Sequence, residues 1–259
     1  MRKAYADIPS GQIHYVEEGK GECLLLLHQS PLSVDEYKDV IPILGKEYWV
    51  LAIDSPGYGG SDVPNSYIPI EEYSKRVLDF LDALRIPKVS VVGSHTGAAI
   101  AVEVAVMAPD RVVKLILNGC PDYEPEVRKS RLTDQKYDPI KIIADGSHLI
   151  RIWKIAQNWS PNCTPESWHR WVVDFLNAGE LDAHQALFRY LIDKRLPLLK
   201  MPTLLISGTE DVFYSRLRES AKLIPKCKIE IIEGGGIIVC YERAKDFAEA
   251  VLEFLREGK

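Results

Sequence analysis

Residues 89–101, VSVVGSHTGAAIA, hold the strongest structural signal in this chain of 259 residues. A short run of apolar residues ends at Val92, and the glycines Gly93 and Gly97 then flank a Ser-His-Thr triplet. Small apolar residues follow at once, which is typical of a helix packed closely against a sheet. The stretch therefore predicts a buried strand, a sharp turn centred on His95, and a helix.

Apolar runs of this kind recur along the chain and alternate with amphipathic stretches. The predicted buried strands are Cys23–Leu27, Tyr48–Ile53, Val89–Val92, Val112–Leu117, Thr203–Ile206 and Lys228–Ile232. Apolar residues spaced three or four apart predict helices over 70–84 and 244–255. Residues 4–8 and 13–16, on either side of a Pro-Ser-Gly turn, predict an antiparallel hairpin. Strands that alternate with helices indicate an α/β fold with a mostly parallel sheet of about eight strands.

The segment 121–196 breaks this rhythm. It has helical periodicity, no strand run, and four of the five tryptophans, at positions 153, 159, 168 and 171. One interpretation is a helical subdomain with a small aromatic core of its own. The other, which we favour, is a helical cap inserted between the core segments 1–120 and 197–259, with an aromatic underside over an apolar pocket.

Composition excludes several classes of protein. The net charge of −5 argues against nucleic acid as a partner, because phosphate binding needs a basic surface. No apolar run reaches the ~18–20 residues that span a bilayer. Five scattered cysteines without a C-x-x-C motif argue against a disulfide framework or a zinc site and favour a cytoplasmic protein.

Sites in parallel sheets form at the carboxyl ends of the strands, so the residues that follow each apolar run are the functional candidates. These residues include His28-Gln29-Ser30-Pro31, the loop 54–62, the His95 turn, the loop 207–211 and the glycine run 234–236 with Ile237.

In this arrangement the chain resembles the α/β-hydrolase-fold superfamily over nearly its full length. The resemblance rests on H-x-x-P at 28–31, D-x-P-G-x-G-x-S-D at 54–62, G-x-x-x-G at 93–97, the helical segment 121–196, and Gly208…Asp211 after a late strand. The family places a nucleophile at the centre of the turn, known as the nucleophile elbow, then an acid and then a histidine along the chain. The resemblance implies an oxyanion hole formed by the backbone of Ser30 and Thr96.

This sequence departs from the family pattern at two of the three catalytic positions. His95 stands at the elbow, Ile237 stands where the family has its histidine, and no histidine follows His184. Ser94 is a poor substitute nucleophile, because the elbow aims only its central side chain into the site. The usual triad is therefore absent, while the acid, Asp211, is retained.

The longer imidazole of His95 suggests a different mechanism. It could reach Asp211, which would fix its tautomer and raise its basicity, so that His95 would serve as a base or as a nucleophile. We expect His28, Gln29, Ile237 and Trp153 to line the pocket. A metal held by His28, His95 and Asp211 is the weaker alternative, since no local ligand spacing supports it.

The sequence thus predicts an enzyme, hydrolase-like, that acts on a small, partly apolar carbonyl or ester-type compound. A lyase, isomerase or decarboxylase would use the same base and oxyanion hole, and a non-catalytic receptor or pseudo-enzyme would keep the same pocket. We expect a small-molecule substrate or ligand, with no cofactor, metal, nucleic acid or membrane partner. The oligomeric state and the identity of the substrate are left open.

Overall fold

The computed structural model describes residues 1–133, 141–178 and 183–258. Eight strands form one sheet in the order β1-β2-β4-β3-β5-β6-β7-β8. The strands are β1 Arg2–Ile8, β2 Gly11–Glu18, β3 Cys23–Leu27, β4 Trp49–Ile53, β5 Val89–Ser94, β6 Val112–Asn118, β7 Thr203–Gly208 and β8 Cys227–Ile232. β1 and β2 pair antiparallel, β2 joins β4 antiparallel, and the remaining pairs are parallel. The predicted hairpin and mostly parallel sheet are confirmed.

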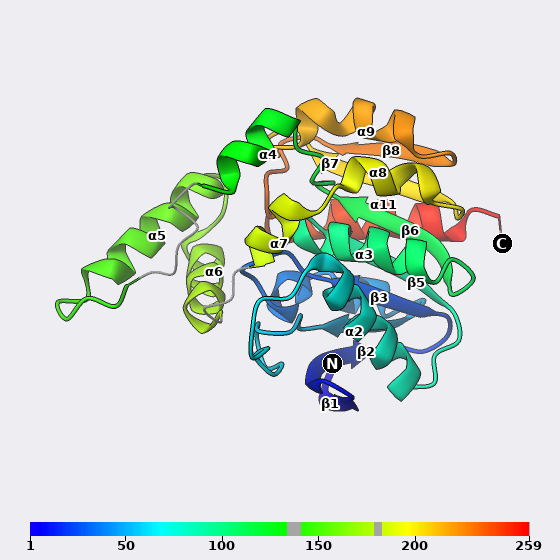
Figure 1. The fold of residues 1–259 in the computed structure, drawn as a ribbon, viewed down its shortest axis with the longest axis horizontal. Helices are drawn as coiled ribbons and strands as arrows, with labels where there is room; N and C mark the ends of the chain where they lie inside the picture. Colours follow the sequence, from blue (N-terminus) through cyan, green and yellow to red (C-terminus); the bar gives the residue numbers. More distant parts are fainter. Residues whose placement is uncertain (134–140, 179–182, 259) are drawn as a thin grey trace.

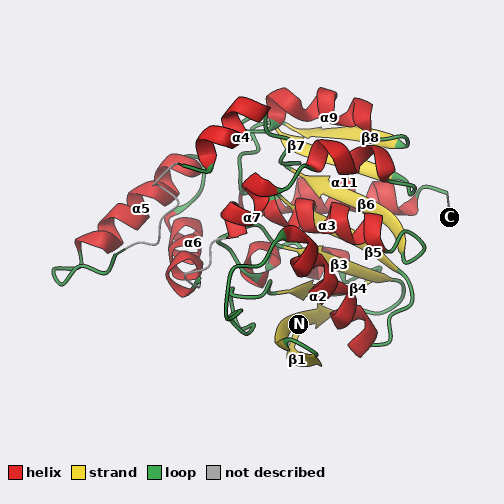
Figure 2. Cartoon of the chain, in the orientation of Figure 1, coloured by secondary structure: helices red, strands yellow, loops and turns green. Residues whose placement is uncertain are grey.

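Helices cover both faces of this sheet, as Figure 1 and Figure 2 show. The helical elements are η1 Val34–Tyr37, α1 Ile41–Leu44, α2 Ile70–Ala83, α3 Thr96–Met107, α4 Pro125–Arg131, α5 Ser147–Trp159, α6 Pro165–Asn177, α7 Ala183–Arg189, α8 Ile192–Arg195, η3 Leu196–Leu198, η4 Tyr214–Arg216, α9 Leu217–Leu223, α10 Val239–Glu242 and α11 Ala244–Arg256. α2 and α3 pack into the core on one face, and α1 and α11 pack into the core on the other.

The sequence patterns of α11 and α3 explain how these two helices pack on the sheet. α11 presents one apolar face, including Phe247, Val251 and Leu255, and these side chains are buried against the sheet. Apart from Thr96 and Glu103, α3 consists of glycine and apolar residues, and it is buried on almost every side because it lies between the sheet, α2, α7 and α8. Its small residues allow this close packing, which fixes the helix that starts at the candidate site.

α5 and α6 extend beyond the end of the sheet and pack on each other (Figure 1). They form a separate aromatic cluster that includes Trp171, which stacks on Phe175 with ring centroids 5.0 Å apart. The cluster also contains Ile238, from the loop after β8. Between β6 and β7 the described residues contain helices and loops without a strand. That this segment acts as a cap over a substrate stays a prediction.

Candidate active site

The turn at His95 joins β5 to α3 through a strained backbone. His95 has φ 47° and ψ −107°, and it is one of two non-glycine residues with positive φ in the described part of the chain. The flanking glycines are required by close approaches: a Cβ on Gly93 would lie 2.3 Å from the carbonyl oxygen of Gly97, and one on Gly97 would lie 2.1 Å from that of Leu27. Such strain costs about 1–3 kcal/mol and is common at functional sites.

His95 reaches across the end of the sheet to Asp211. Its Nε2 lies 2.8 Å from Oδ2 of Asp211, and both side chains are largely buried. The other carboxylate oxygen, Oδ1, accepts the backbone N–H of Phe213 at 2.7 Å, which fixes the orientation of the acid. Gly119, after β6, leaves room for the pair, because a Cβ there would lie 2.3 Å from Nε2 of His95.

Two opposing effects act on the pKa of His95. Burial disfavours the charged imidazolium, but the charge of Asp211 and its hydrogen bond outweigh burial, with a further contribution from the charge of Glu36. The pKa of His95 is therefore raised above its ordinary value. Nδ1 is the ring nitrogen that is not hydrogen-bonded to Asp211. In a serine at this position the hydroxyl oxygen would take the place of Cγ of His95, and Nδ1 lies one bond beyond Cγ.

The backbone near His95 offers two amide donors. Thr96 is the first residue of α3, where backbone N–H groups have no partner within the helix. In the loop after β3 the N–H of Gln29 is already bonded to Oε2 of Glu36 at 2.8 Å, which leaves Ser30 as the neighbouring candidate. Ser30 and Thr96 both line the cavity that contains His95.

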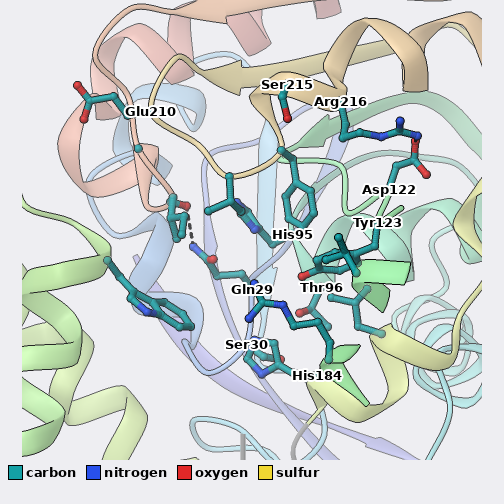
Figure 3. Close-up of a pocket in the computed structure, with 18 of the residues that line it drawn as sticks. Gln29, Ser30, His95, Thr96, Asp122, Tyr123, His184, Glu210, Ser215 and Arg216 are labelled. Carbon is teal, nitrogen blue, oxygen red and sulfur yellow. Dashed lines mark hydrogen bonds and ion pairs between the residues drawn. The ribbon is translucent and has the colours of Figure 1, made fainter. Parts of the chain in front are cut away.

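This cavity has a volume of about 630 Å³ and lies at the carboxyl end of the strands (Figure 3). Its apolar wall includes Trp159, Leu187, Phe213 and Ile237, and its polar lining includes Gln29, Tyr123, Asn158, His184, Ser215 and Arg216. That volume lies within the range of about 300–1,000 Å³ that is usual for small-molecule sites. The cavity therefore suits a small ligand with both apolar and polar parts.

Of the four residues expected to line the pocket, two are among the described lining residues of the cavity. Gln29 and Ile237 line the cavity, and Nε2 of Gln29 donates to the carbonyl oxygen of Ile237 at 3.1 Å. His28 and Trp153 are not among the described lining residues. Trp153 instead packs edge-on against Trp168 within the α5–α6 pair, with ring centroids 6.1 Å apart.

His28 has a structural role in its loop. Its Nδ1 donates to the carbonyl oxygen of Gln29 at 2.9 Å, and its Nε2 accepts the N–H of Ser55 at 2.8 Å. Burial lowers the pKa of His28, which favours this neutral tautomer. Because both ring nitrogens of His28 form hydrogen bonds, neither is free to bind a metal. The alternative of a metal held by His28, His95 and Asp211 therefore lacks one of its three ligands. Among the described residues, no group of three or more His, Cys, Asp or Glu side chains is placed to hold a metal.

The hydroxyl of Ser94 lies away from the cavity, in the interior of the fold. It accepts hydrogen bonds from the hydroxyl of Tyr37 at 2.9 Å and from Nδ2 of Asn118 at 3.2 Å. Ser94 is fully buried. It is therefore poorly placed to attack a ligand in the cavity.

Among the residues at or near the site, the sequence prediction did not place Glu36, Gly119 or His184 there. Glu36 lies seven residues beyond Gln29 on η1, Gly119 follows β6, and His184 lies on α7. Gly119 had a usable signal, since it follows an apolar strand as Gly93 does. Glu36 and His184 had none, because their approach to the site depends on how helices pack.

No helix in the described ranges combines the length and apolar character needed to cross a membrane. All five cysteines are free. Neither observation bears on the chemistry of the cavity.

Comparison with known proteins agrees with the architecture. The model of the alpha/beta hydrolase fold family matches residues 22–244. A 2-hydroxy-6-oxo-6-phenylhexa-2,4-dienoate hydrolase of Comamonas testosteroni is 27% identical over 97% of this chain and 93% of its own length. A 2-hydroxy-6-oxo-6-(2'-aminophenyl)hexa-2,4-dienoic acid hydrolase of Metapseudomonas resinovorans is 29% identical over 94% of this chain and 87% of its own length.

Among solved structures, the enol-lactonase from Burkholderia xenovorans LB400 superimposes with a TM-score of 0.85 and 22% sequence identity, over 98% of this chain and all of that one. At this identity the likeness speaks for the fold alone. The family match, by contrast, spans most of the chain, including β3 to β8, the His95 turn and the loop of Asp211. The chain belongs to the alpha/beta hydrolase fold family.

Proposed function

We propose that this protein is a hydrolase of a small, partly apolar carbonyl or ester-type compound, with His95 as the catalytic base or nucleophile. The observation that carries the proposal is the His95–Asp211 pair at 2.8 Å, held at a strained turn that opens into a cavity of about 630 Å³. A strained residue, a buried acid and a cavity rarely coincide without a functional reason. The relatives named above as hydrolases support the same class of reaction.

In the proposed mechanism Asp211 accepts a hydrogen bond from the Nε2–H of neutral His95, so that the lone pair of the ring lies on Nδ1. Nδ1 removes a proton from water as the water oxygen attacks the carbonyl carbon of the substrate. The carbonyl oxygen then becomes an oxyanion that the N–H groups of Ser30 and Thr96 stabilise. His95 returns the proton to the leaving group as the intermediate collapses, and Asp211 stabilises the imidazolium throughout.

The lone pair of Nδ1 would equally allow His95 to attack the carbonyl directly and form an acyl-imidazole. The two routes differ in kinetics, because direct attack releases the leaving group in a burst before steady state. Both routes require neutral His95. Since the pKa of His95 is raised, turnover should decrease as the pH falls through the titration of His95.

The test is turnover of a graded series of short and medium aryl esters by the wild type and by His95→Ala. The proposal predicts turnover well above the buffer rate for the wild type and loss of about 10²–10⁴-fold in the variant. Acyl chain length then maps the depth of the cavity. Equal inactivity of both proteins would exclude ester hydrolysis. Binding of an apolar small molecule without product would then favour a receptor.

A further inference from the structure

Glu36 is a buried acid close to the site for which the proposed mechanism has no role. It lies on η1, with none of its surface exposed to solvent. Its Oε2 accepts the backbone N–H of Gln29 at 2.8 Å, and its Oε1 lies 3.3 Å from Nε2 of the same residue. The carboxylate of Glu36 therefore hydrogen-bonds to both the backbone and the side chain of Gln29, the residue before Ser30.

Gln29 extends this contact to the opposite side of the cavity. Its Nε2 also donates to the carbonyl oxygen of Ile237 at 3.1 Å. Glu36, Gln29 and Ile237 thus form a hydrogen-bonded bridge between the loop after β3 and the loop after β8. Gln29 and Ile237 line the cavity, whereas Glu36 lies behind them. Breaking the bridge would free the loop that presents the Ser30 amide.

Glu36 also faces the turn that carries His95. Tyr37, the next residue on η1, donates its hydroxyl to Oγ of Ser94, the residue before His95, at 2.9 Å. Among the described residues, other titratable groups that interact with Glu36 include Tyr37 on its own element and Cys240 and Tyr241 on α10. His95 is the group in this set that can neutralise the charge of Glu36.

We propose that Glu36 is a positioning residue of the His95 site, which holds the Gln29–Ser30 backbone in place for the oxyanion and presents a second negative charge, besides Asp211, to the His95 ring. This inference rests on the proposed function, because it assigns a role within the same site. The role is indirect: Glu36 acts through Gln29 and His95 and does not touch the substrate.

The ionisation of Glu36 fits this role. Burial raises the pKa of Glu36 to about 7, although its hydrogen bond with the Gln29 N–H and the charge of His95 act in the opposite direction. In turn, the charge of Glu36 contributes to the raised pKa of His95. The charges of Glu36 and His95 therefore influence each other's protonation.

The test uses Glu36→Gln, which removes the charge and keeps the shape and an acceptor for the Gln29 N–H. Without the Glu36 charge, the pKa of His95 should fall. This fall is measured by NMR titration of protein labelled at histidine, with the His95 signal assigned from its loss in His95→Ala. The acidic limb of kcat/KM should move to lower pH in the same variant. The plateau should fall about tenfold, because the oxyanion loop is less well held.

Two further variants separate charge from position. Gln29→Ala breaks the bridge to Ile237 and leaves the Glu36 charge, so it should lower the plateau without moving the acidic limb. Glu103→Gln is the matched control, because Glu103 is a buried carboxylate on α3 that binds the Tyr190 hydroxyl at 2.7 Å, away from the cavity. It should leave both the limb and the pKa of His95 unchanged.

An unchanged pKa of His95 in Glu36→Gln, in a protein that folds as the wild type does, would overturn the inference. An equal shift in Glu103→Gln would overturn it too, since the effect would then be general. The NMR readout needs no turnover. If His95→Ala keeps full activity while Glu36→Gln still shifts the pKa of His95, the proposed function fails and the electrostatic role of Glu36 stands.

Discussion

The described part of the chain contains two buried His–Asp pairs, and their geometry is nearly the same. Nδ1 of His14 lies 2.7 Å from Oδ2 of Asp54, and Nε2 of His95 lies 2.8 Å from Oδ2 of Asp211. His14 and His95 are also almost equally buried. Distance and burial therefore do not distinguish a structural pair from a catalytic one.

The surroundings of the two pairs differ. Asp54 also accepts the backbone N–H of Val34 at 2.7 Å and that of Gly60 at 2.8 Å, so it ties two loops together. Although burial opposes ionisation, the hydrogen bonds of Asp54 with His14 and these amides, and the charge of His28, keep its pKa below the usual range. His14 lies within β2 and is not among the described residues that line the cavity.

His95, by contrast, lies on a strained turn and lines the cavity. In both pairs the second ring nitrogen, Nε2 of His14 and Nδ1 of His95, has no hydrogen bond to a described residue. A histidine that lines a cavity can take a proton from a ligand or water there, whereas neither His14 nor Asp54 is among the described lining residues and Asp54 holds two loops together. The predictions below use the His14–Asp54 pair as an internal reference.

Among the changes that leave His95 in place, the largest effect is expected for Asp211→Asn. The amide cannot stabilise the imidazolium as the carboxylate does, and the fixed tautomer of His95 is lost. We expect kcat/KM to fall about 10²–10³-fold and its acidic limb to move to lower pH, since the charge that raises the pKa of His95 is gone. Steady-state kinetics from pH 5 to 9 would check both effects. Full activity in this variant would remove Asp211 from the mechanism.

Asp174 extends the comparison to a partly buried acid without a histidine partner among the described residues. It lies on α6 and bonds to the backbone N–H and hydroxyl of Ser33, at 3.0 and 2.9 Å. Burial raises the pKa of Asp174 from 3.8 to about 7, so the folded protein loses stability as the pH rises through this range.

Asp174→Asn should remove this loss. We expect the variant to be more stable than the wild type at pH 8 by on the order of 2 kcal/mol, with little difference at pH 4. Urea unfolding at the two pH values measures the change. The raised pKa of Glu36 also makes the folded protein less stable as the pH rises. The quantity to compare is therefore the difference in the free energy of unfolding between Asp174→Asn and the wild type at each pH. A gain in stability that is the same at both pH values would mean that ionisation of Asp174 is not its cause.

A third change tests whether Ile237 occupies the position at which the family has its catalytic histidine. In His95→Ser/Ile237→His a serine stands at the elbow and an imidazole stands after the glycine run, in the order that the family uses. We expect aryl ester turnover about tenfold above that of His95→Ser alone. Ile237→His by itself is the matched control. No gain in the double variant would mean that Ile237 is not positioned to relay a proton between residue 95 and Asp211.

The smallest effect is expected for the reference pair. His14→Gln keeps a donor for Asp54 but loses the ring contact with Tyr5, whose centroid lies 5.2 Å away. We expect a loss of about 1 kcal/mol in the free energy of unfolding. Thermal and urea unfolding at pH 7 would detect it. A loss of turnover without a loss of stability would show that the two pairs are not functionally different.

Much of the fold could be predicted from the sequence because its signals are local. Apolar runs such as Cys23–Leu27 matched the strands within a residue or two, and the spacing of glycines around His95 identified the turn. The pairing of His95 with Asp211 could be proposed because parallel strands end at one edge of the sheet. That inference needed only the order of motifs along the chain.

The parts that could not be predicted depend on packing between distant elements. Trp153 and Trp159 look equivalent in sequence, but only Trp159 is among the cavity-lining residues, because the rotation of α5 about its axis decides which one faces inward. His28 was expected in the pocket, yet its loop turns the ring toward Ser55. In the sequence Glu36 is one of several acids in a polar stretch, and its hydrogen bond to the Gln29 N–H is seen only in the folded chain.

The most direct test of the account is turnover by His95→Gln and His14→Gln, measured beside the wild type on the best aryl ester of the series at pH 8. The account predicts that His14→Gln keeps activity within about twofold of the wild type, and that His95→Gln falls by at least about 10²-fold. Circular dichroism would establish that both variants are folded. Equal activity of the wild type and His95→Gln would contradict the central claim that the His95–Asp211 pair is the catalytic centre.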